Sequence, residues 1–542
     1  MSYINELLRQ GKHEELWQMC CGFIDLNVAQ FMDIQKRLLL EQIELLKTCR
    51  LGRKVMRGAM PETIDEFREQ VPLTTYADYC PELLDQSENA LPAKPDFWVQ
   101  TTGRSGEYAH KYIPITHRFW EEAGIDFSAV ALFDACKERG KFAFKNGLKL
   151  LYGMGPPPYL TGNIACKLGE HLGLQYLPPL GLSEEMSFDE RVGKGVKLAL
   201  ADGMDGFFGL AGVLVAIGEK IRQGSGSTKL SSLIFQPKVM LRLARGLIKS
   251  KLAGRPMLPK DLWSIKVICC MGTDSTVYKK RVEDLWGRTP VDVYGNSEMT
   301  IIATQTWDYD SMVFYPNLNF LEFIPEDEST KWYMDQSYQP KTVLLDEVKA
   351  GECYEVVATN FHGGALVRYR VGDIIRITAL RNEKLGIDLP QMVFERRTQD
   401  FIDLEFIRLT ERSIWQAIEN TGISYQDWVA SKDGGKEPRL KLYLELKGDY
   451  DISEEDVAKA VYEQIKILDN GLYVYKEFDS LEKFIDFKPI EVTLLPKGTF
   501  ANYKATRQTE GSGLAHLKPP HINPSEEALS LLGTDTIAAS KI

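Results

Sequence analysis

The chain has 542 residues, of which 44% are hydrophobic and 26% are charged, a composition typical of a globular protein with two or three domains. Its formal net charge of -11 argues against a general nucleic-acid-binding protein. The nine cysteines are odd in number and form no C-x-x-C pair, which disfavours a zinc site or a disulfide framework and favours a reducing compartment.

No membrane-spanning or secretory segment is predicted. The amino terminus carries acidic residues and lacks the apolar core of a signal peptide. The most apolar window, Phe207 to Ile217, is shorter than the roughly 20 residues that cross a bilayer, so a buried helix is expected there. We therefore expect a cytoplasmic protein with neither membrane nor nucleic-acid partners.

In chain order, the first strong pattern is helical. Residues Phe31 to Leu51 carry apolar side chains at helical spacing and predict a long amphipathic helix. Residues Phe97 to Gln100 then predict a short strand, because they are aromatic and β-branched. A Thr/Gly/Ser loop follows at Thr101–Glu107, and such a loop offers the hydroxyls and backbone N–H groups that hold phosphate. It is neither a Walker loop nor a dinucleotide fingerprint, so a polar surface turn is the alternative.

The middle of the chain predicts an α/β arrangement. Helical and extended segments alternate from Phe119 to Ser250, interrupted by the proline-rich Gly153–Pro158. Residues Lys266–Cys270 predict a strand and Thr276–Trp286 a helix. The next strand, Val291–Val293, leads into a functional loop at its carboxyl end, where ligand crevices form in such folds.

The pattern then becomes antiparallel, and a small domain follows. Residues Phe320 to Thr378 are strand-rich, with a tight turn expected at Tyr369–Asp373 between strands Ala365–Val371 and Ile374–Thr378. A domain boundary is expected near Arg396 to Asp400. Beyond it, helices and strands predict a small α+β domain, with these segments: Leu409–Asn420, Leu440–Leu446, Glu454–Leu468 and Ile490–Leu495. Residues Gly511 to Ile542 predict a loosely held tail.

Four motifs occur in a fixed order: the Thr/Gly/Ser loop, Tyr294-Gly295-Asn296-Ser297-Glu298, Tyr369-Arg370-Val371-Gly372-Asp373, and Asn502-Tyr503-Lys504-Ala505-Thr506-Arg507. Together they resemble the signatures of adenylate-forming enzymes, and more narrowly those of the Gretchen Hagen family of acyl-acid amido synthetases. Further support comes from Lys111–Thr116 and from Phe314–Pro325. The resemblance covers roughly residues 30 to 510. It implies an α/β protein with a large multi-sheet N-terminal domain (1–396), a small mobile α+β lid (397–510) and the tail (511–542).

The resemblance also implies a set of ATP-binding residues. Four of the site residues have a structural alternative: a solvated Lys111, a core Tyr294, a helix-starting Glu298, or a hairpin Gly-Asp pair at Asp373. The expected nucleotide contacts are Thr101, Thr102, Gly103, Ser105, Gly106, Lys111, Tyr294, Gly295, Asn296, Ser297, Arg370, Asp373 and Arg397. Arg104 departs from the family pattern, and either contacts phosphate or shields the loop.

Catalysis is expected to depend on two residues. Glu298 is the candidate ligand for Mg²⁺ beside the ATP oxygens. Lys504, with Lys497 as the alternative, is expected to enter from the lid and stabilise charge at the α-phosphate. The implied reaction joins a carboxylic acid to AMP and then transfers the acyl group to an amine, such as that of an amino acid, in a monomeric enzyme. Coenzyme A is the alternative acceptor, and a non-catalytic nucleotide- or acyl-binding protein is the alternative from another class. The seven histidines show no triad spacing, so a serine or cysteine hydrolase is not supported.

Overall fold

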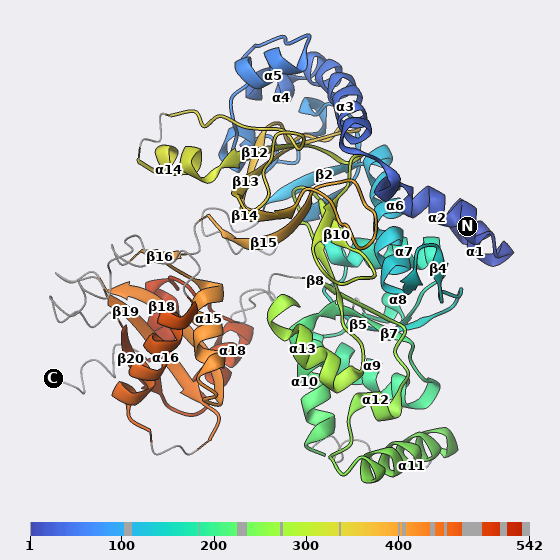
Figure 1. The fold of residues 1–542 in the computed structure, drawn as a ribbon, viewed down its shortest axis with the longest axis vertical. Helices are drawn as coiled ribbons and strands as arrows, with labels where there is room; N and C mark the ends of the chain where they lie inside the picture. Colours follow the sequence, from blue (N-terminus) through green and yellow to red (C-terminus); the bar gives the residue numbers. More distant parts are fainter. Residues whose placement is uncertain are drawn as a thin grey trace. The chain divides into compact units, whose positions relative to one another are not determined.

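A computed structural model of the chain divides into two compact units, one formed by residues 1–101 and 110–394 and the other including residues 395–542 (Figure 1). The structure describes residues 2–101, 111–183, 185–224, 236–271, 275–334, 338–398, 401–403, 408–433, 439–448, 452–468, 490–509 and 518–533. Within these residues, no helix is both long enough and apolar enough to cross a bilayer.

The first unit begins with helices whose starts are encoded by capping residues. The side chains of Ser2, Asn27 and Thr63 accept hydrogen bonds from backbone N–H groups of α1, α3 and α5. These and their neighbours are α1 (Tyr3–Gln10), α2 (His13–Cys21), α3 (Val28–Thr48), α4 (Arg50–Val55) and α5 (Ile64–Gln70).

The predicted long helix at Phe31–Leu51 is wrong at its end. Helix α3 stops at Thr48, and Cys49 adopts an extended conformation with φ -101° and ψ 157°. The Cys49 sulfur accepts a hydrogen bond from Gly52 N and so caps a new helix, α4. Helical spacing continues across this break, so the periodicity alone does not show it.

The phosphate-loop motif lies between two paired strands. Strand β1 (Pro95–Gln100) confirms the strand predicted at Phe97–Gln100, and it pairs antiparallel with β2 (Tyr112–Thr116). Helix α6 (His117–Asp134) follows directly, with Thr116 as its N-cap, and is buried along most of its length. A short β3–β4 pair (Cys136–Glu138 and Lys141–Phe142) comes next.

A sheet of eleven strands forms the centre of this unit, in the order β12-β13-β14-β15-β11-β10-β9-β8-β7-β5-β6. From β6 to β9 the strands are parallel and joined by helices, which confirms the predicted strand–helix–strand segment. The elements of this half are β5 (Lys149–Gly153), α7 (Leu160–Leu172), β6 (Gln175–Leu177), α8 (Leu180–Ser183), α9 (Phe188–Asp202), β7 (Gly206–Leu210), α10 (Ala211–Arg222), α11 (Pro237–Leu252), α12 (Pro259–Leu262), β8 (Val267–Met271), α13 (Ser275–Trp286) and β9 (Val291–Tyr294).

The expected buried helix at Phe207–Ile217 is wrong for its first half. Residues Gly206–Leu210 are the buried strand β7, and only from Ala211 does the chain become helix α10. A short apolar run fits a buried strand as well as a buried helix, so its periodicity does not separate the two. Side chains of both elements pack in one core with α9, α12 and α13.

The other half of the sheet is antiparallel, as predicted. It contains β10 (Ala303–Gln305), β11 (Met312–Phe314), β12 (Asn319–Pro325), β13 (Cys353–Asn360), β14 (Tyr369–Ala379) and β15 (Gln391–Arg397), with α14 (Glu326–Met334) after β12.

The predicted tight turn at Tyr369–Asp373 is wrong. Strand β14 runs without interruption from Tyr369 to Ala379, and both of its halves pair with β13. Arg370 lies opposite Val357 and Ile374 opposite Glu355, so residues 371–373 form a bulge in the strand. Gly372, with φ 77°, supplies the positive φ that this bulge requires.

The second unit is a small α+β domain, as predicted for this part of the chain. Strands β18 (Tyr425–Asp433), β19 (Arg439–Leu446) and β20 (Ile490–Leu495) form a three-stranded sheet. Ser453 caps α16 by accepting a hydrogen bond from Asp456 N, at 3.1 Å. The remaining elements are β16 (Phe401–Asp403), β17 (Arg408–Thr410), α15 (Glu411–Asn420), α16 (Glu454–Leu468), α18 (Thr499–Thr509) and α19 (Glu526–Leu531).

The predicted loose tail is wrong for residues 518–533. The imidazole of His521 is 13% exposed in this domain, with Nδ1 2.7 Å from Glu411 Oε1 and Nε2 2.9 Å from Asp427 Oδ1. Its ring stacks on Trp428 with centroids 4.4 Å apart. Ala528 from α19 and Leu532, which follows this helix, complete a small hydrophobic cluster with β18 and α18.

Candidate functional site

Three of the motif segments meet within the first unit. They are the ends of the β1–β2 connection, the loop after β9, and the start of β14 beside its bulge. Lys111 from the first, Glu298 from the second and Tyr369 from the third are in hydrogen-bond contact. Lys111 thus contacts Glu298, which is 187 positions away in the chain, and Tyr369, which is 258 positions away.

The loop after β9 is held by its own backbone. Thr300 N donates to Asn296 O at 2.7 Å, and Met299 N donates to the Asn296 side-chain Oδ1 at 2.8 Å. A Cβ on Gly295 would lie 2.3 Å from Thr300 O, so this position accepts only glycine. Ser297, half-buried, completes the turn that delivers Glu298. The loop is therefore a rigid support for the Glu298 carboxylate.

Glu298 belongs to a compact polar cluster. Lys111 Nζ lies 3.2 Å from Glu298 Oε1 and donates at 3.2 Å to the Tyr369 hydroxyl, which in turn donates to Glu298 Oε1 at 3.4 Å. The side chains of Lys111 and Glu298 are only 16% and 14% exposed, so their attraction is screened less than that of a surface pair. Burial, and then the negative charge of Glu298, raise the pKa of Tyr369 well above its usual range, so Tyr369 stays a neutral donor.

Two further side chains fix this cluster and were not among the predicted site residues. The ring of Tyr76 lies under Lys111 Nζ, with 5.4 Å from the nitrogen to the centroid. Asn360 Nδ2 donates to the Glu298 backbone oxygen at 3.2 Å. Tyr369 is part of the motif Tyr369–Asp373 but was not predicted as a site residue. Its place in that motif is the sequence feature that could have indicated its role. Tyr76 and Asn360 lie in no motif, so no sequence pattern indicates them.

A second contact links the loop after β9 to the bulge in β14. The Tyr294 hydroxyl donates to Asp373 Oδ2 at 3.0 Å, and both residues are buried, at 6% exposure each. The Tyr294 ring also lies against Phe394, with centroids 6.1 Å apart. The bulge at Gly372 turns the Asp373 side chain toward Tyr294, because three residues oppose a single residue of β13 there.

Arg370 contacts a different set of residues. Its guanidinium makes a two-pronged ion pair with Glu355 of β13, at 2.8 and 2.6 Å, and stacks 3.8 Å from the centroid of the Trp332 ring. The Arg370 side chain is 8% exposed and that of Glu355 is 1% exposed. This pair ties the two strands together beside the bulge. Arg397 is the last residue of β15, and its side chain lies outside the described residues.

The phosphate loop is described only at its ends. Thr101 N donates to Lys111 O at 2.9 Å, and Lys111 N donates to the Thr101 hydroxyl at 3.0 Å. These two bonds close the mouth of the loop and hold Lys111 beside Glu298. The other predicted phosphate contacts, Thr102, Gly103, Ser105 and Gly106, and also Arg104, lie outside the described residues.

Lys504 lies in the second unit, in the middle of helix α18 rather than on a loop. The start of this helix is anchored by Glu445, whose carboxylate accepts hydrogen bonds from Gly498 N at 2.7 Å and from Phe500 N at 2.9 Å. Tyr503 packs in the hydrophobic cluster beneath the helix. Lys504 is half-buried and Lys497, in the preceding turn, is exposed. Movement of Lys504 therefore requires movement of the helix with its domain.

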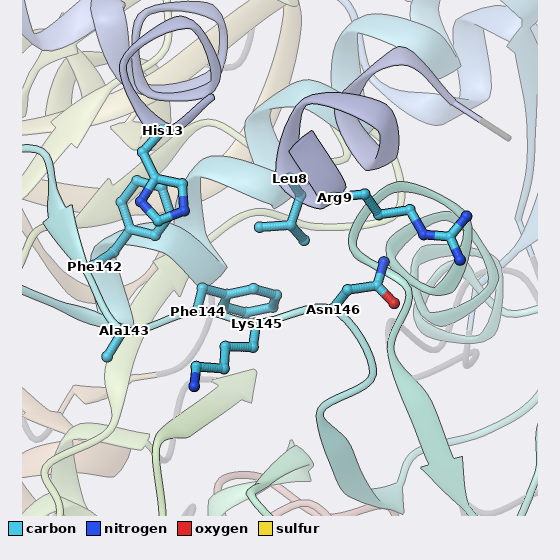
Figure 2. Close-up of a pocket in the computed structure, with 8 residues that line it drawn as sticks. All are labelled: Leu8, Arg9, His13, Phe142, Ala143, Phe144, Lys145 and Asn146. Carbon is cyan, nitrogen blue, oxygen red and sulfur yellow. The ribbon is translucent and has the colours of Figure 1, made fainter. Parts of the chain in front are cut away.

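A surface pocket of about 470 Å³ lies elsewhere in the first unit (Figure 2). It is formed by helices α1 and α2 and by the segment after β4, and no predicted site residue is among those that line it. Its lining is Leu8, Arg9, His13, Phe142, Ala143, Phe144, Lys145 and Asn146. Among the described residues, no group of three or more His, Cys, Asp or Glu side chains could hold a metal ion.

Comparison with known families agrees with the motifs. The model of the GH3 (Gretchen Hagen) family N-terminal domain matches residues 21–152, and that of the GH3 family central domain matches residues 312–397. These ranges contain the phosphate loop, Lys111, Arg370 and Asp373. The chain is therefore similar to the N-terminal and central domains of the GH3 family, in agreement with the family resemblance predicted from the motifs.

Curated relatives are similar over part of their length. The chain is 28% identical over 241 residues to the 4-substituted benzoates-glutamate ligase GH3.12 of Arabidopsis thaliana, covering 42% of this chain and 39% of that protein. It is 25% identical over 268 residues to the jasmonoyl–L-amino acid synthetase GH3.5 of Oryza sativa subsp. japonica, covering 46% and 44%. The matched segments thus span about two fifths of these relatives.

Solved structures show the same fold over nearly the whole chain. The AtGH3.15 acyl acid amido synthetase in complex with 2,4-DB superposes with a TM-score of 0.66 at 18% identity, covering 95% of each chain. A 2-hydroxyisobutyryl-CoA ligase in its postadenylation state gives a TM-score of 0.63 at 12% identity, covering 95% of this chain and 93% of that one. The chain has the fold of adenylate-forming ligases, with a large multi-stranded α/β part and a small α+β domain.

Proposed function

We propose that this protein is an ATP-dependent ligase that activates a carboxylic acid as an acyl-adenylate and transfers the acyl group to the amine of an amino acid. The observation that carries this proposal is the cluster of Lys111, Glu298 and Tyr369, contributed by three motifs of an adenylate-forming fold. GH3 relatives whose names state acid and amino-acid substrates support the choice of acceptor.

The nucleotide is proposed to lie along the motif segments. The phosphate loop would bind the phosphates through its hydroxyl and N–H groups. The proposed residues are Thr101, Thr102, Gly103, Ser105 and Gly106. The face of Tyr294, with the loop Gly295–Asn296–Ser297, would meet adenine. Asp373 would accept hydrogen bonds from the ribose hydroxyls, since a carboxylate is an acceptor only. Tyr294 then binds the base and, through its hydroxyl, positions the carboxylate that binds the sugar.

Arg370 and Arg397 are proposed to act at the edges of this site. Because its guanidinium is held by Glu355, Arg370 would maintain the bulge that presents Asp373 rather than contact the nucleotide with its charge. Arg397 ends β15 next to the boundary between the two units, where it would contact nucleotide as the units rotate.

Mg²⁺ is the proposed metal, with Glu298 as its protein ligand. A site with a single carboxylate suits this ion, which keeps several waters and is bound in nucleotide sites by one or two carboxylates with phosphate oxygens. Bound there, it would neutralise charge on the phosphates. Lys111 holds one Glu298 oxygen and would fix the direction of the other.

The first chemical step joins a substrate carboxylate oxygen to the α-phosphorus, and the bond to pyrophosphate breaks. Lys504, carried by α18, would stabilise the negative charge at the α-phosphate. The large domain (1–396) would hold ATP and acid, and the small domain (397–510) would rotate as a lid about residues 397–400, excluding water from the adenylate. In the second step the acceptor nitrogen attacks the acyl carbon and AMP leaves.

The proposed setting is a monomer in a reducing compartment such as the cytoplasm. None of the nine cysteines forms a disulfide, and five of them are buried. Burial raises the pKa of the Cys20 and Cys21 thiols above their usual range, so they stay protonated and unreactive. The acid is proposed to be partly apolar, such as an aryl or medium-chain acid, because the region from Leu151 to Phe208 combines buried aromatic side chains with glycine and proline residues.

The test is acid-dependent exchange of pyrophosphate into ATP, across a panel of aryl and medium-chain acids, with Mg²⁺. Product formation is then measured by mass spectrometry with amino acids and with coenzyme A offered together. Amide formation supports the proposal. Thioester formation alone would replace the acceptor by coenzyme A, and ATP binding without exchange on any acid would point to a non-catalytic nucleotide-binding protein.

A further inference from the structure

Helix α11 carries the most concentrated exposed hydrophobic surface among the described residues. Five of the fourteen large hydrophobic side chains that are exposed there belong to this one helix: Met240 55%, Leu241 54%, Leu247 51%, Ile248 59% and Leu252 84%. Such grouping differs from the scattered exposed leucines of an ordinary surface. Figure 1 places α11 at the end of the first unit away from β12 and β13, and so away from the motif site.

The helix has a separate face that holds it to the protein. Val239, Gly246 and Ser250 are buried, and Leu243 packs against the core of the unit. A Cβ on Gly246 would lie 2.7 Å from Leu262 Cδ2, so α11 sits close against α12. Arg242 donates to the backbone oxygens of Ala199 and Leu200 at the end of α9. The helix is therefore fixed through one side, and its exposed side is free of these contacts.

The exposed side is divided into an apolar arc and a basic arc. At 3.6 residues per turn, the five exposed hydrophobic residues and Ala244 cover about 140° of the helix surface. Lys238, Arg245 and Lys249 border this arc on one side, and Lys251 projects within it; all four are exposed. None of the four makes an ion pair with an acidic side chain in the part of the chain that the structure describes. The whole segment from residue 220 to residue 260 contains ten basic and no acidic residues, in a chain of net charge -11.

We infer that α11 binds the surface of an anionic lipid bilayer, lying in the plane of the interface with Leu241, Leu247 and Ile248 among the acyl chains. The charge pattern selects a negatively charged partner, because Lys238, Arg245 and Lys249 border the apolar arc on one side, where they would meet phosphate head groups. The apolar arc has no Tyr or Trp, the anchors typical of protein interfaces, and forms a convex ridge of flexible aliphatic chains that suits lipid. This is peripheral binding, which requires no spanning helix. It stands independently of the reaction proposed above.

The experiment uses flotation of the full chain with vesicles of phosphatidylcholine containing 30% phosphatidylglycerol, and with phosphatidylcholine alone, at low and high salt. The wild type is expected to float with the anionic vesicles at low salt and to be released at high salt. Ile248→Asp is expected to weaken binding by at least about tenfold, since it removes an aliphatic group that would enter the acyl chains and adds a charge that anionic lipid repels. Replacing Lys238, Arg245 and Lys249 together by Gln is expected to weaken binding roughly 100-fold, at about fivefold per basic residue.

Leu380→Asp is the matched control, because Leu380 is 50% exposed in the same unit but lies outside α11, and its binding should equal that of the wild type. Equal binding by Ile248→Asp would overturn the inference, as would failure of the wild type to float. A wild type that ignores vesicles but binds a polyglutamate peptide would assign the face to an acidic protein instead. A dimer in light scattering that Ile248→Asp dissociates, without vesicle binding, would assign it to a second copy of the chain.

Discussion

The Tyr294 hydroxyl and Asp373 Oδ2 lie 3.0 Å apart, although 79 residues separate them in the chain. This hydrogen bond joins the carboxyl end of β9, where the parallel half of the sheet ends, to the bulge in β14 of the antiparallel half. The two halves of the nucleotide site proposed here are thus coupled through one buried contact. A ligand that orders either residue orders the other.

Tyr294→Phe tests this coupling. The variant keeps the aromatic face for adenine but removes a donor from a buried carboxylate, at a cost of roughly 1–3 kcal/mol. We expect the KM for ATP to rise about tenfold in acid-dependent pyrophosphate exchange, with the KM for the acid unchanged. Tyr354→Phe, which removes a buried hydroxyl bonded to Glu352, is the control and should leave both constants unchanged. Equal effects of the two variants would contradict the coupling.

Lys111 is expected to be needed for adenylation. Lys111→Met keeps most of the side-chain length but removes the charge beside Glu298, and we expect pyrophosphate exchange to fall by about 100-fold, as when a charge-stabilising group is lost. Lys141→Met, which removes an exposed lysine paired with Glu138, should have no effect. An exchange rate for Lys111→Met within threefold of the wild type would exclude Lys111 from the site.

Gly295 is expected to tolerate no side chain. Gly295→Ala places a methyl group 2.3 Å from a backbone oxygen that cannot move away without opening the loop, and overpacking of this kind costs roughly 1–3 kcal/mol. Urea unfolding should show the loss of stability, and ATP binding should weaken with it. Gly193→Ala, in helix α9 with open space around it, should instead stabilise by about 0.5–1 kcal/mol. If both variants gave equal stability, the loop would be softer than its contacts indicate.

The His521 contacts predict a pH dependence of the small domain. Burial acts to lower the pKa of His521, but the hydrogen bonds and charges of Asp427 and Glu411 outweigh it and raise the pKa to about 9. A raised pKa means that the stabilisation is complete below the unfolded value of about 6.5 and is lost as the pH rises through 9. This shift in the pKa of His521 corresponds to a contribution of the order of 3 kcal/mol to the free energy of unfolding.

We therefore expect the free energy of unfolding of the wild type to fall between pH 6.5 and pH 9.5, while His521→Gln, already less stable, changes little over this range. Protection of the Ala430 amide, which donates to His521 O, gives a local measurement by hydrogen exchange. His117→Gln is the control, because His117 also pairs with a carboxylate but is 75% exposed. Parallel pH curves for the wild type and His521→Gln would contradict the prediction.

Much of the local structure could be predicted from the sequence, because its causes are local. Strand β20 and helices α13 and α16 lie within one residue of their predicted bounds, and the Ser453 cap of α16 is as expected. Period and capping residues define such elements without help from the rest of the chain.

The features that sequence reasoning missed depend on distant partners. The bulge at Gly372 exists because β13 pairs with both halves of β14, which a Gly-Asp pair by itself does not indicate. The folded structure of residues 518–533 depends on contacts with Asp427 and Glu411, about 100 positions earlier in the chain. No hydrophobic periodicity in the segment predicts it. The contact of Lys111 with Glu298 was not predicted either. The family motifs predicted only that both residues lie near the bound ATP.

The path of residues 521–523 has a consequence for solubility. Ala430 N donates to His521 O and Asn523 N donates to Ala430 O, so this segment occupies the side of β18 that β19 leaves open. An uncovered strand edge is a template for pairing with other chains. A chain shortened before Lys518 would therefore expose that edge, and it is expected to self-associate through intermolecular β-pairing even where its motif site is intact.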